Sequence, residues 1–77
     1  MEQIAIIFGN VLRMKRKEIG LTQEQLAFES DLQRVYISIL ELGQQQPSLS
    51  TILKLAKGLN CPAAELIEAV EDKINQY

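Results

Sequence analysis

The chain has 77 residues, of which 47% are apolar, and carries a net charge of −2. Its length fits one small domain that folds alone around a limited core, and the high apolar fraction points to a surface buried by a partner. No apolar run reaches about 18 residues, so we expect no transmembrane helix and no membrane partner. The stretch Ile4–Phe8 is too short for a signal peptide and lacks a basic flank. A single cysteine provides no disulfide framework, so the expected location is the cytoplasm.

A first helix is expected from about Gln3 to Glu18, because apolar residues recur there at the spacing of one buried helix face. These inner residues are Ile4, Phe8, Val11 and Leu12. Gly20 suits the position just past the helix end, since a residue without a Cβ enters the left-handed conformation at little cost. The first helix should therefore end in a sharp turn.

Several local signals agree on where the second helix begins. Thr22 is expected as the N-cap, and Gln25, three residues later, completes a capping box. Leu21 and Leu26 occupy the two positions of a hydrophobic staple. The helix is expected to run to about Ser30.

A tight turn at Asp31 separates this helix from a third, short helix over about Gln33 to Leu42. Aspartate tolerates a positive φ better than most residues, although less well than glycine. The buried stripe of the third helix consists of Leu32, Ile37 and Leu40, and its opposite face of Gln33, Arg34, Val35 and Ser38. Two short helices joined by one tight turn predict a helix-turn-helix, which inserts its second helix into the DNA major groove.

Two further helices are expected in the second half of the chain. After a glutamine-rich loop at residues 43–47, Ser48 or Ser50 is expected to cap the fourth helix. Asn60 should end that helix in the left-handed conformation, and Pro62 should open a fifth helix that runs to the C-terminus. The pattern therefore indicates an all-α chain.

From Phe8 to Leu66 the chain resembles the DNA-binding domains of the Xre/Cro type, the family of the lambdoid phage repressors. The matching residues are Phe8-Gly9, Arg16-Lys17-Glu18, Gly20-Leu21-Thr22-Gln23, Gln25-Leu26-Ala27, Tyr36-Ile37-Ser38, Leu40-Glu41, Gly43, Pro47-Ser48-Leu49, Leu55-Ala56 and Glu65-Leu66. The resemblance implies an all-α, five-helix, lambda-repressor-like domain over residues 1–77, with the helix-turn-helix at helices two and three. The short length and the fifth helix also resemble the controller proteins of restriction–modification systems.

The resemblance implies DNA contacts from both helices of the motif. Gln23, at the start of the second helix, matches a residue that contacts the DNA backbone or a base, and free N–H groups at a helix start suit a phosphate. A solvated helix-end residue is the alternative interpretation of Gln23. On the third helix the matching recognition positions are Gln33, Arg34, Val35, Ser38 and Ile39. Arginine pairs with guanine, glutamine with adenine, and valine or isoleucine contacts a thymine methyl group.

Residues on and just after the third helix differ in the DNA contact expected of them. Arg34 is the strongest candidate for a base contact because it is the only cation on its face, and a phosphate contact alone is the alternative. Tyr36 is expected to donate its hydroxyl to a phosphate while its ring packs on the domain, or to serve core packing alone. Gln44 is expected to contact a phosphate without releasing a counterion. Ile39 and Leu42 stand where relatives often have basic residues, which indicates thymine methyl contacts or a protein-binding surface.

Arg16 and Glu41 are interpreted as architecture. The family holds an arginine and a glutamate at these positions in an ion pair between the first helix and the recognition helix. A buried pair loses about 3–5 kcal/mol when one partner is removed, whereas a surface pair is worth less than about 1 kcal/mol. The sequence leaves both alternatives open.

The distribution of charge argues partly against DNA binding, because DNA-binding proteins are usually basic on the contact face. Residues 1–61 carry seven basic and six acidic side chains, giving +1, and residues 62–77 carry one basic and four acidic side chains, giving −3. The excess of negative charge thus lies in the terminal helix, and a DNA-binding part at +1 predicts only modest affinity of a monomer for DNA.

A dimer would raise that affinity, and the terminal helix over about residues 62–76 suits one. Its apolar residues recur at spacings of four and three in a continuous seam of Ala63, Ile67, Val70, Ile74 and Tyr77. We expect a two-fold homodimer through this seam, assisted by Ile4 and Ile7, with half-sites about 34 Å apart. A terminal helix folded on its own core is the alternative.

Nothing in the sequence indicates an enzyme. The chain has no histidine, no metal-ligand cluster, no phosphate-binding glycine loop and no nucleophile with a partner base, so we expect no metal and no cofactor. Cys61 is expected to pack in the core. The sequence predicts a sequence-specific regulator that binds double-stranded DNA as a homodimer on a palindromic operator. The alternative is a protein-interaction module of antitoxin-like type on the same fold, with weak or no DNA binding.

Overall fold

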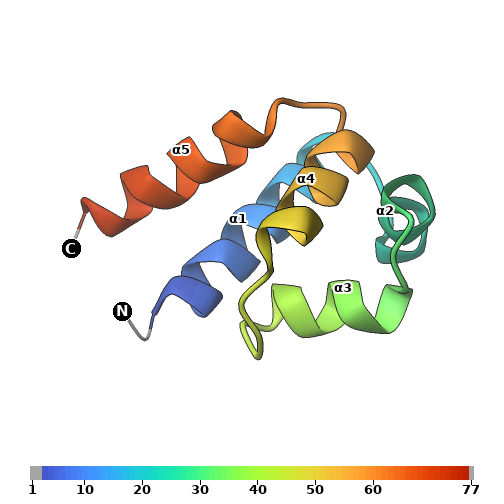
Figure 1. Ribbon diagram of the computed structural model, residues 1–77, viewed down its shortest axis with the longest axis horizontal. Helices are drawn as coiled ribbons and strands as arrows, with labels where there is room; N and C mark the ends of the chain where they lie inside the picture. The colour runs from blue at the N-terminus through green and yellow to red at the C-terminus, as the bar shows by residue number, and fades with distance from the viewer. Residues whose placement is uncertain (1–2, 77) are drawn as a thin grey trace.

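The computed structural model describes residues 3–76 and consists of helices joined by short loops (Figure 1). The helices are α1 (Ile4–Glu18), α2 (Gln23–Ser30), α3 (Arg34–Glu41), α4 (Leu49–Gly58) and α5 (Ala63–Ile74). No strand occurs within the described residues. The expected all-α, five-helix fold is confirmed, with α5 ending two residues before the expected position 76. Within residues 3–76 no helix combines the length and the apolarity that a membrane crossing requires.

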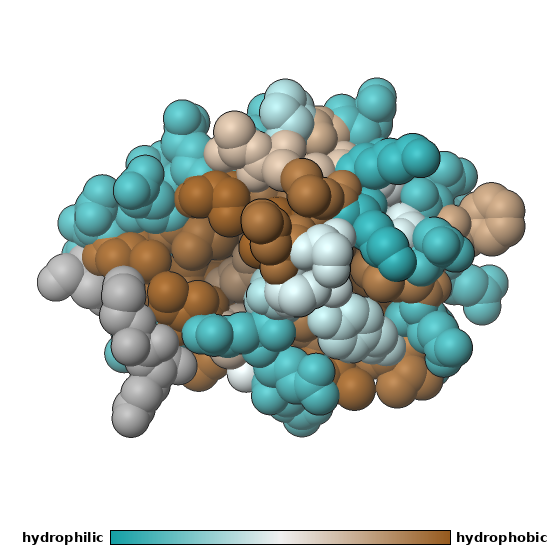
Figure 2. Space-filling view, viewed as in Figure 1, coloured by the Kyte–Doolittle hydropathy of each residue, from teal (hydrophilic) through white to brown (hydrophobic). Residues whose placement is uncertain are grey.

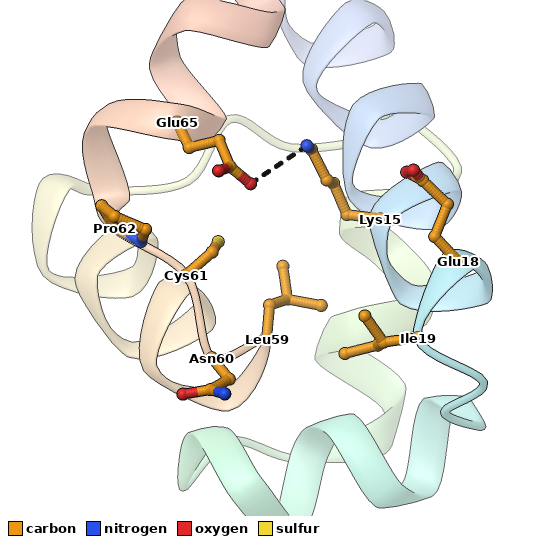
Figure 3. Close-up of a pocket in the computed structure, with 8 residues that line it drawn as sticks. All are labelled: Lys15, Glu18, Ile19, Leu59, Asn60, Cys61, Pro62 and Glu65. Atoms are coloured by element: carbon orange, nitrogen blue, oxygen red, sulfur yellow. Dashed lines mark hydrogen bonds and ion pairs between the residues drawn. The ribbon is translucent and has the colours of Figure 1, made fainter.

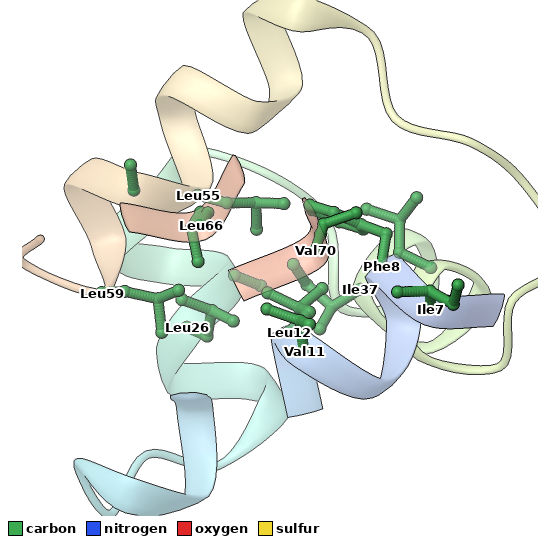
Figure 4. Packing of buried hydrophobic residues seen from close by; sticks show 13 residues of the cluster. Ile7, Phe8, Val11, Leu12, Leu26, Ile37, Leu55, Leu59, Leu66 and Val70 are labelled. Carbon is green, nitrogen blue, oxygen red and sulfur yellow. The ribbon is translucent and has the colours of Figure 1, made fainter. Parts of the chain in front are cut away.

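All five helices contribute to one apolar core (Figure 4). Of the four residues expected on the inner face of α1, Phe8, Val11 and Leu12 are buried and Ile4 is partly buried. Ile37 and Leu40 of α3 are fully buried, as expected for the stripe of a recognition helix. The core therefore fixes which side of α3 faces outward.

The start of α2 is built as the sequence predicts. The Gln25 backbone N–H donates to Thr22 Oγ1 at 3.1 Å, and the Thr22 backbone N–H donates to Gln25 Oε1 at 2.9 Å, which completes the capping box. Leu26 is fully buried, and Leu21 is partly buried against the same core. These contacts fix the angle at which the chain enters the motif.

The helix ends also follow local signals. Asp31 has φ 55° and Asn60 has φ 57°, so both expected left-handed positions are confirmed. Of the two serines considered for α4, Ser48 is the cap, because its Oγ accepts from the Thr51 backbone N–H at 3.2 Å. The turn at Asp31 separates α2 and α3 as a helix-turn-helix requires.

Gly9 allows α1 and α3 to approach each other closely. A Cβ at this position would overlap the carbonyl oxygen of Leu40 and lie 2.8 Å from that of Glu41. The C-terminal end of α3 therefore rests on the backbone of α1, with no side chain of residue 9 between them.

The apolar seam expected along α5 is divided between core and surface. Leu66 and Val70, one helical turn apart, point inward, and Val70 is only 9% exposed. Ala63 and Ile74 pack partly against the same core, whereas Ile67 is 45% exposed. Val70 is thus not the free dimer contact that the sequence suggested, because this short chain uses it to complete its own core. Tyr77, the last residue of the seam, lies outside the described residues.

A second correction concerns α1. Ile7, expected to assist a dimer, is buried in the core and 6% exposed. Ile4 remains partly exposed at the start of the helix. The apolar surface left for a partner is therefore smaller than the sequence indicated, because Ile7 and most of Val70 are buried in the core.

Candidate nucleic-acid interface

The outward face of α3 has the chemistry that base recognition requires. Gln33, Arg34 and Val35 are exposed, while Ser38 and Ile39 are half-buried at the margins of this face. Figure 1 shows α3 along one side of the molecule, with no helix covering its outer face. Neither of the two ion pairs within residues 3–76 involves Arg34. Its guanidinium is therefore available to a base or a phosphate.

Arg16 and Glu41 form a buried, bidentate ion pair between α1 and α3. Arg16 Nε donates to Glu41 Oε2 at 2.6 Å, and Nη2 donates to Oε1 at 3.0 Å. The side chains are only 10% and 4% exposed, so the pair is the buried alternative and not the surface one. The hydrogen bond to Glu41 raises the pKa of Arg16 against the opposing effect of burial, so the guanidinium stays charged.

The same arginine also contacts the loop that opens the motif. Arg16 Nη1 donates to the carbonyl oxygen of Leu21 at 2.8 Å. Arg16 therefore joins the end of α1 to the end of α3 and to the residue before the α2 cap. One side chain fixes three segments of the helix-turn-helix relative to one another.

Gln23, the DNA-contact candidate on α2, is hydrogen-bonded to this pair. Its Nε2 donates to Glu41 Oε1 at 3.1 Å, and the side chain is half-buried. Gln23 is therefore not the freely solvated helix-end residue of the alternative interpretation.

Tyr36 makes one apolar and one polar contact within the domain. It packs partly against the core, and its hydroxyl lies 3.3 Å from Thr51 Oγ1 at the start of α4. Ser48 Oγ lies 3.1 Å from Thr51 Oγ1 and 3.0 Å from Ser50 Oγ. We call these four residues the hydroxyl cluster. Sequence reasoning treated the two serines only as caps, although the Ser48-x-Ser50-Thr51 spacing at a helix start could have indicated a polar site.

The α3 side and the α5 side of the molecule differ in charge. Gln44 is exposed in the loop that follows α3. The four carboxylates of the terminal segment belong to α5, which lies on the side of the molecule opposite α3 (Figure 1). The acidic helix thus lies away from the face that carries Arg34.

A hollow of about 270 Å³ lies between the end of α1 and the start of α5 (Figure 3). Lys15 Nζ and Glu65 Oε2 meet at 3.1 Å across it, and the sulfur of Cys61 points toward them. Burial raises the pKa of the Cys61 thiol, which keeps it protonated and poorly nucleophilic. Within residues 3–76 no group of three or more His, Cys, Asp or Glu side chains could hold a metal ion.

A second hollow, of about 310 Å³, is lined mainly by apolar side chains from α1, α4, α5 and the loop before α4. We call it the apolar groove; its lining residues are Ile4, Phe8, Gln46, Pro47, Ile52, Ile67, Val70, Glu71 and Ile74. Figure 2 shows apolar side chains gathered on this face of the molecule. The exposed apolar surface of α5 therefore opens onto a groove.

Comparison with known proteins decides the family. A family model described as helix-turn-helix matches residues 12–66. The chain belongs to this family. Control protein C.MunI of Mycoplasma sp is 40% identical over 72 residues, which cover 92% of this chain and 97% of that protein.

Two solved structures extend the likeness to the fold. The restriction-modification controller protein C.AhdI of Aeromonas hydrophila matches with a TM-score of 0.78 and 47% identity, over 80% of this chain and 94% of that one. The wild-type restriction-modification controller protein C.Esp1396I matches with a TM-score of 0.87 and 28% identity, over 96% of each chain. The resemblance to Xre/Cro-type domains is confirmed, and so is the narrower resemblance to controller proteins. The chain is a DNA-binding, helix-turn-helix transcriptional regulator.

Proposed function

We propose that this regulator binds a palindromic operator as a homodimer in the cytoplasm and controls restriction–modification genes. The observation that carries the proposal is the outward face of α3, where Arg34 is exposed and outside both ion pairs of residues 3–76. The genetic context is taken from the controller proteins that the chain resembles over most of its length.

The exposed face of α3 is assigned to base recognition. Arg34 pairs bidentately with guanine, Gln33 pairs with adenine, and Val35 contacts a thymine methyl group. Ser38 and Ile39, half-buried at the edge of this face, contact bases or the adjoining sugars. These five positions set the operator sequence together with the shape of the DNA.

Phosphate contacts are assigned to the residues that flank α3. The hydroxyl cluster lies at the N-terminus of α4, where backbone N–H groups and the helix dipole favour an anion. The Tyr36 hydroxyl reaches this cluster from α3 itself, and Gln44 offers an exposed amide just after α3. Gln23 adds a contact from the start of α2. Such contacts set the register of α3 in the groove.

The apolar groove is assigned to the dimer. Ile67 is its most exposed apolar member on α5, and Ile74, Ile4 and Ile52 line the same groove. In a two-fold dimer the same patch meets itself, so Ile67 of each copy would lie in or beside the groove of the other. Two copies then present two α3 helices to half-sites about 34 Å apart, which doubles the number of phosphate contacts.

The test is selection of random duplexes by the purified protein, followed by binding measurements against salt concentration. We expect a palindrome and a steep log–log salt dependence. Arg34→Ala should weaken binding by about tenfold or more and relax the preference at one position of each half-site. Lys57→Ala, which removes an exposed cation at the other end of α4, is the matched control and should change little.

The dimer is tested separately by analytical ultracentrifugation of Ile67→Asp, which should sediment as a monomer while keeping its helical content. An Ile67→Asp protein that stays dimeric would remove the groove as the interface. A wild-type protein that selects no duplex even at low salt would contradict the proposed operator and leave the protein-interaction module as the better description.

A further inference from the structure

Glu41 receives hydrogen bonds from two other helices at once. Arg16 of α1 donates to both of its oxygens, at 2.6 and 3.0 Å, and Gln23 of α2 donates to Oε1 at 3.1 Å. Only 4% of the Glu41 side chain is exposed. The carboxylate is therefore enclosed by two donors, one of which belongs to a candidate DNA-contact residue.

The chemistry of Glu41 dictates how the Gln23 amide must lie. A carboxylate paired with a guanidinium only accepts hydrogen bonds, so the amide has to turn its nitrogen toward Glu41. The second N–H and the carbonyl oxygen of Gln23 then remain for another partner. An amide without this constraint could present either its N–H or its carbonyl oxygen to that partner with equal ease.

Gln23 is the first residue of α2, where backbone donors are also available. The capping box uses the backbone N–H groups of Thr22 and Gln25. Within residues 3–76 no side chain accepts from the N–H groups of the two residues between them, Gln23 and Glu24. Two backbone donors and one side-chain donor therefore stand together at the positive end of the helix.

We infer that Glu41 is a positioning residue for a phosphate contact made by Gln23. By holding one amide N–H, Glu41 makes the other N–H available to a phosphate oxygen, beside the backbone donors of α2. This inference rests on the proposed DNA-binding function and deepens it. Because Arg16 holds Glu41 in place, the ion pair that fixes α3 also fixes the phosphate contact of α2, so the two helices engage DNA in one register.

A double-mutant cycle on the duplex selected by the wild-type protein tests the inference. Gln23→Ala alone should weaken binding by about tenfold, the typical loss for a hydrogen bond to a charged group. Glu41→Gln preserves the shape of residue 41 but can offer either an N–H or a carbonyl oxygen to Gln23. In that background Gln23→Ala should therefore weaken binding by only about twofold or less. The slope of affinity against salt should stay unchanged for Gln23→Ala, because a neutral amide releases no counterion.

The effect of each variant on folding stability must be distinguished from its effect on the position of the residue 23 side chain. Each variant is melted, and binding is measured well below the lowest melting temperature. If Glu41→Gln does not fold, variants of Gln23 are compared in the chain that keeps Glu41. Gln23→Lys supplies donors to both Glu41 and the phosphate and should bind at least as tightly as the wild type, whereas Gln23→Met, which has no donor, should lose about tenfold.

The outcomes are distinct. Equal effects of Gln23→Ala in both backgrounds, or equal losses for the lysine and methionine variants, would overturn the positioning role while leaving DNA binding intact. Absence of wild-type binding to any selected duplex would overturn the proposed function and this inference with it. A tenfold loss that shrinks to twofold in the Glu41→Gln background would support both.

Discussion

α3 and α5 both pack on α1, but polar contacts have a larger part in holding α3 than in holding α5. On the α3 side, Arg16 makes hydrogen bonds of 2.6 to 3.0 Å that reach α3 and the loop before α2. On the α5 side, Leu66 and Val70 are buried by apolar contact, and the ion pair between Lys15 and Glu65 is partly exposed. α3 is therefore held by directional bonds in addition to the burial of Ile37 and Leu40, and α5 mainly by non-directional burial.

This difference matches the role proposed for each helix. A recognition helix must hold its side chains within a fraction of an ångström of the base edges, and hydrogen bonds of fixed geometry provide that precision. A helix that presents an apolar surface to a second copy can tolerate small shifts, because burial depends on area and not on angle. The comparison implies that single polar changes damage the α3 side most.

The largest expected effect comes from Arg16→Met. Glu41 would stay buried without its partner, so the free energy of unfolding in urea should fall by about 3–5 kcal/mol. Lys15→Met breaks the more exposed pair on the α5 side and should cost less than about 1 kcal/mol. Similar losses for the two variants would mean that α3 and α5 are held alike. The double variant Arg16→Met with Glu41→Leu should recover much of the lost stability, since no charge is then left unpaired.

The division of the α5 seam is tested by truncating two of its residues. Val70→Ala removes buried methyl groups and should lower the free energy of unfolding by about 2 kcal/mol. Ile67→Ala removes exposed ones and should change the stability of the monomer by less than about 0.5 kcal/mol. Both are measured at a protein concentration low enough to dissociate a dimer. A loss for Val70→Ala as small as that for Ile67→Ala would return α5 to the orientation that the sequence suggested, with both side chains in the dimer seam.

A smaller effect is expected where α2 meets α4. Ser30 is 2% exposed, and its hydroxyl has no hydrogen-bond partner within the described residues. Ser30→Ala should therefore raise the free energy of unfolding by about 1 kcal/mol. Thr51→Ala, which removes a hydroxyl that does contact Tyr36 and Ser48, is the matched control and should lower it by about the same amount. Destabilisation by Ser30→Ala would show that this hydroxyl has a partner in solution.

The smallest effect is expected at two residues that share one backbone conformation, one next to α3 and one next to α5. Asp31 ends α2 beside α3, and Asn60 precedes α5, and both are left-handed. Replacing either with glycine should raise the free energy of unfolding by about 0.5–1 kcal/mol, because glycine adopts this conformation without steric cost. Thermal melts of Asp31→Gly and Asn60→Gly check this. A clear loss at Asp31 alone would indicate that its carboxylate contributes to the turn.

The fold could be predicted where neighbouring residues decide the conformation. Thr22 and Gln25 satisfy each other's backbone across three positions, and Asp31 and Asn60 stop their helices through their own preferences. The family motif identified the exposed face of α3, because its buried stripe leaves one orientation for that helix. Such signals are local, so a single sequence contains them.

Contacts between distant residues could not be predicted in the same way. The apolar residues of α5 cover a wide arc, and only the space left by α1 and α4 decides that Val70 points inward and Ile67 outward. The contact of Gln23 with Glu41 spans 18 positions, and that of Tyr36 with Thr51 spans 15. No periodicity or cap indicates either one. The polar partners of the candidate site became visible only once the helices were packed.

The close approach at Gly9 has a consequence for altering specificity. The C-terminal end of α3 lies against the backbone of α1 at Gly9. A side chain at position 9 would displace α3. The position of α3 relative to α1 is therefore independent of the outward residues of α3. Variants of this protein that differ only at Gln33, Arg34, Val35 and Ser38 should bind new operator sequences while the position of α3 stays unchanged. The chain is therefore a suitable scaffold for selecting altered DNA specificities.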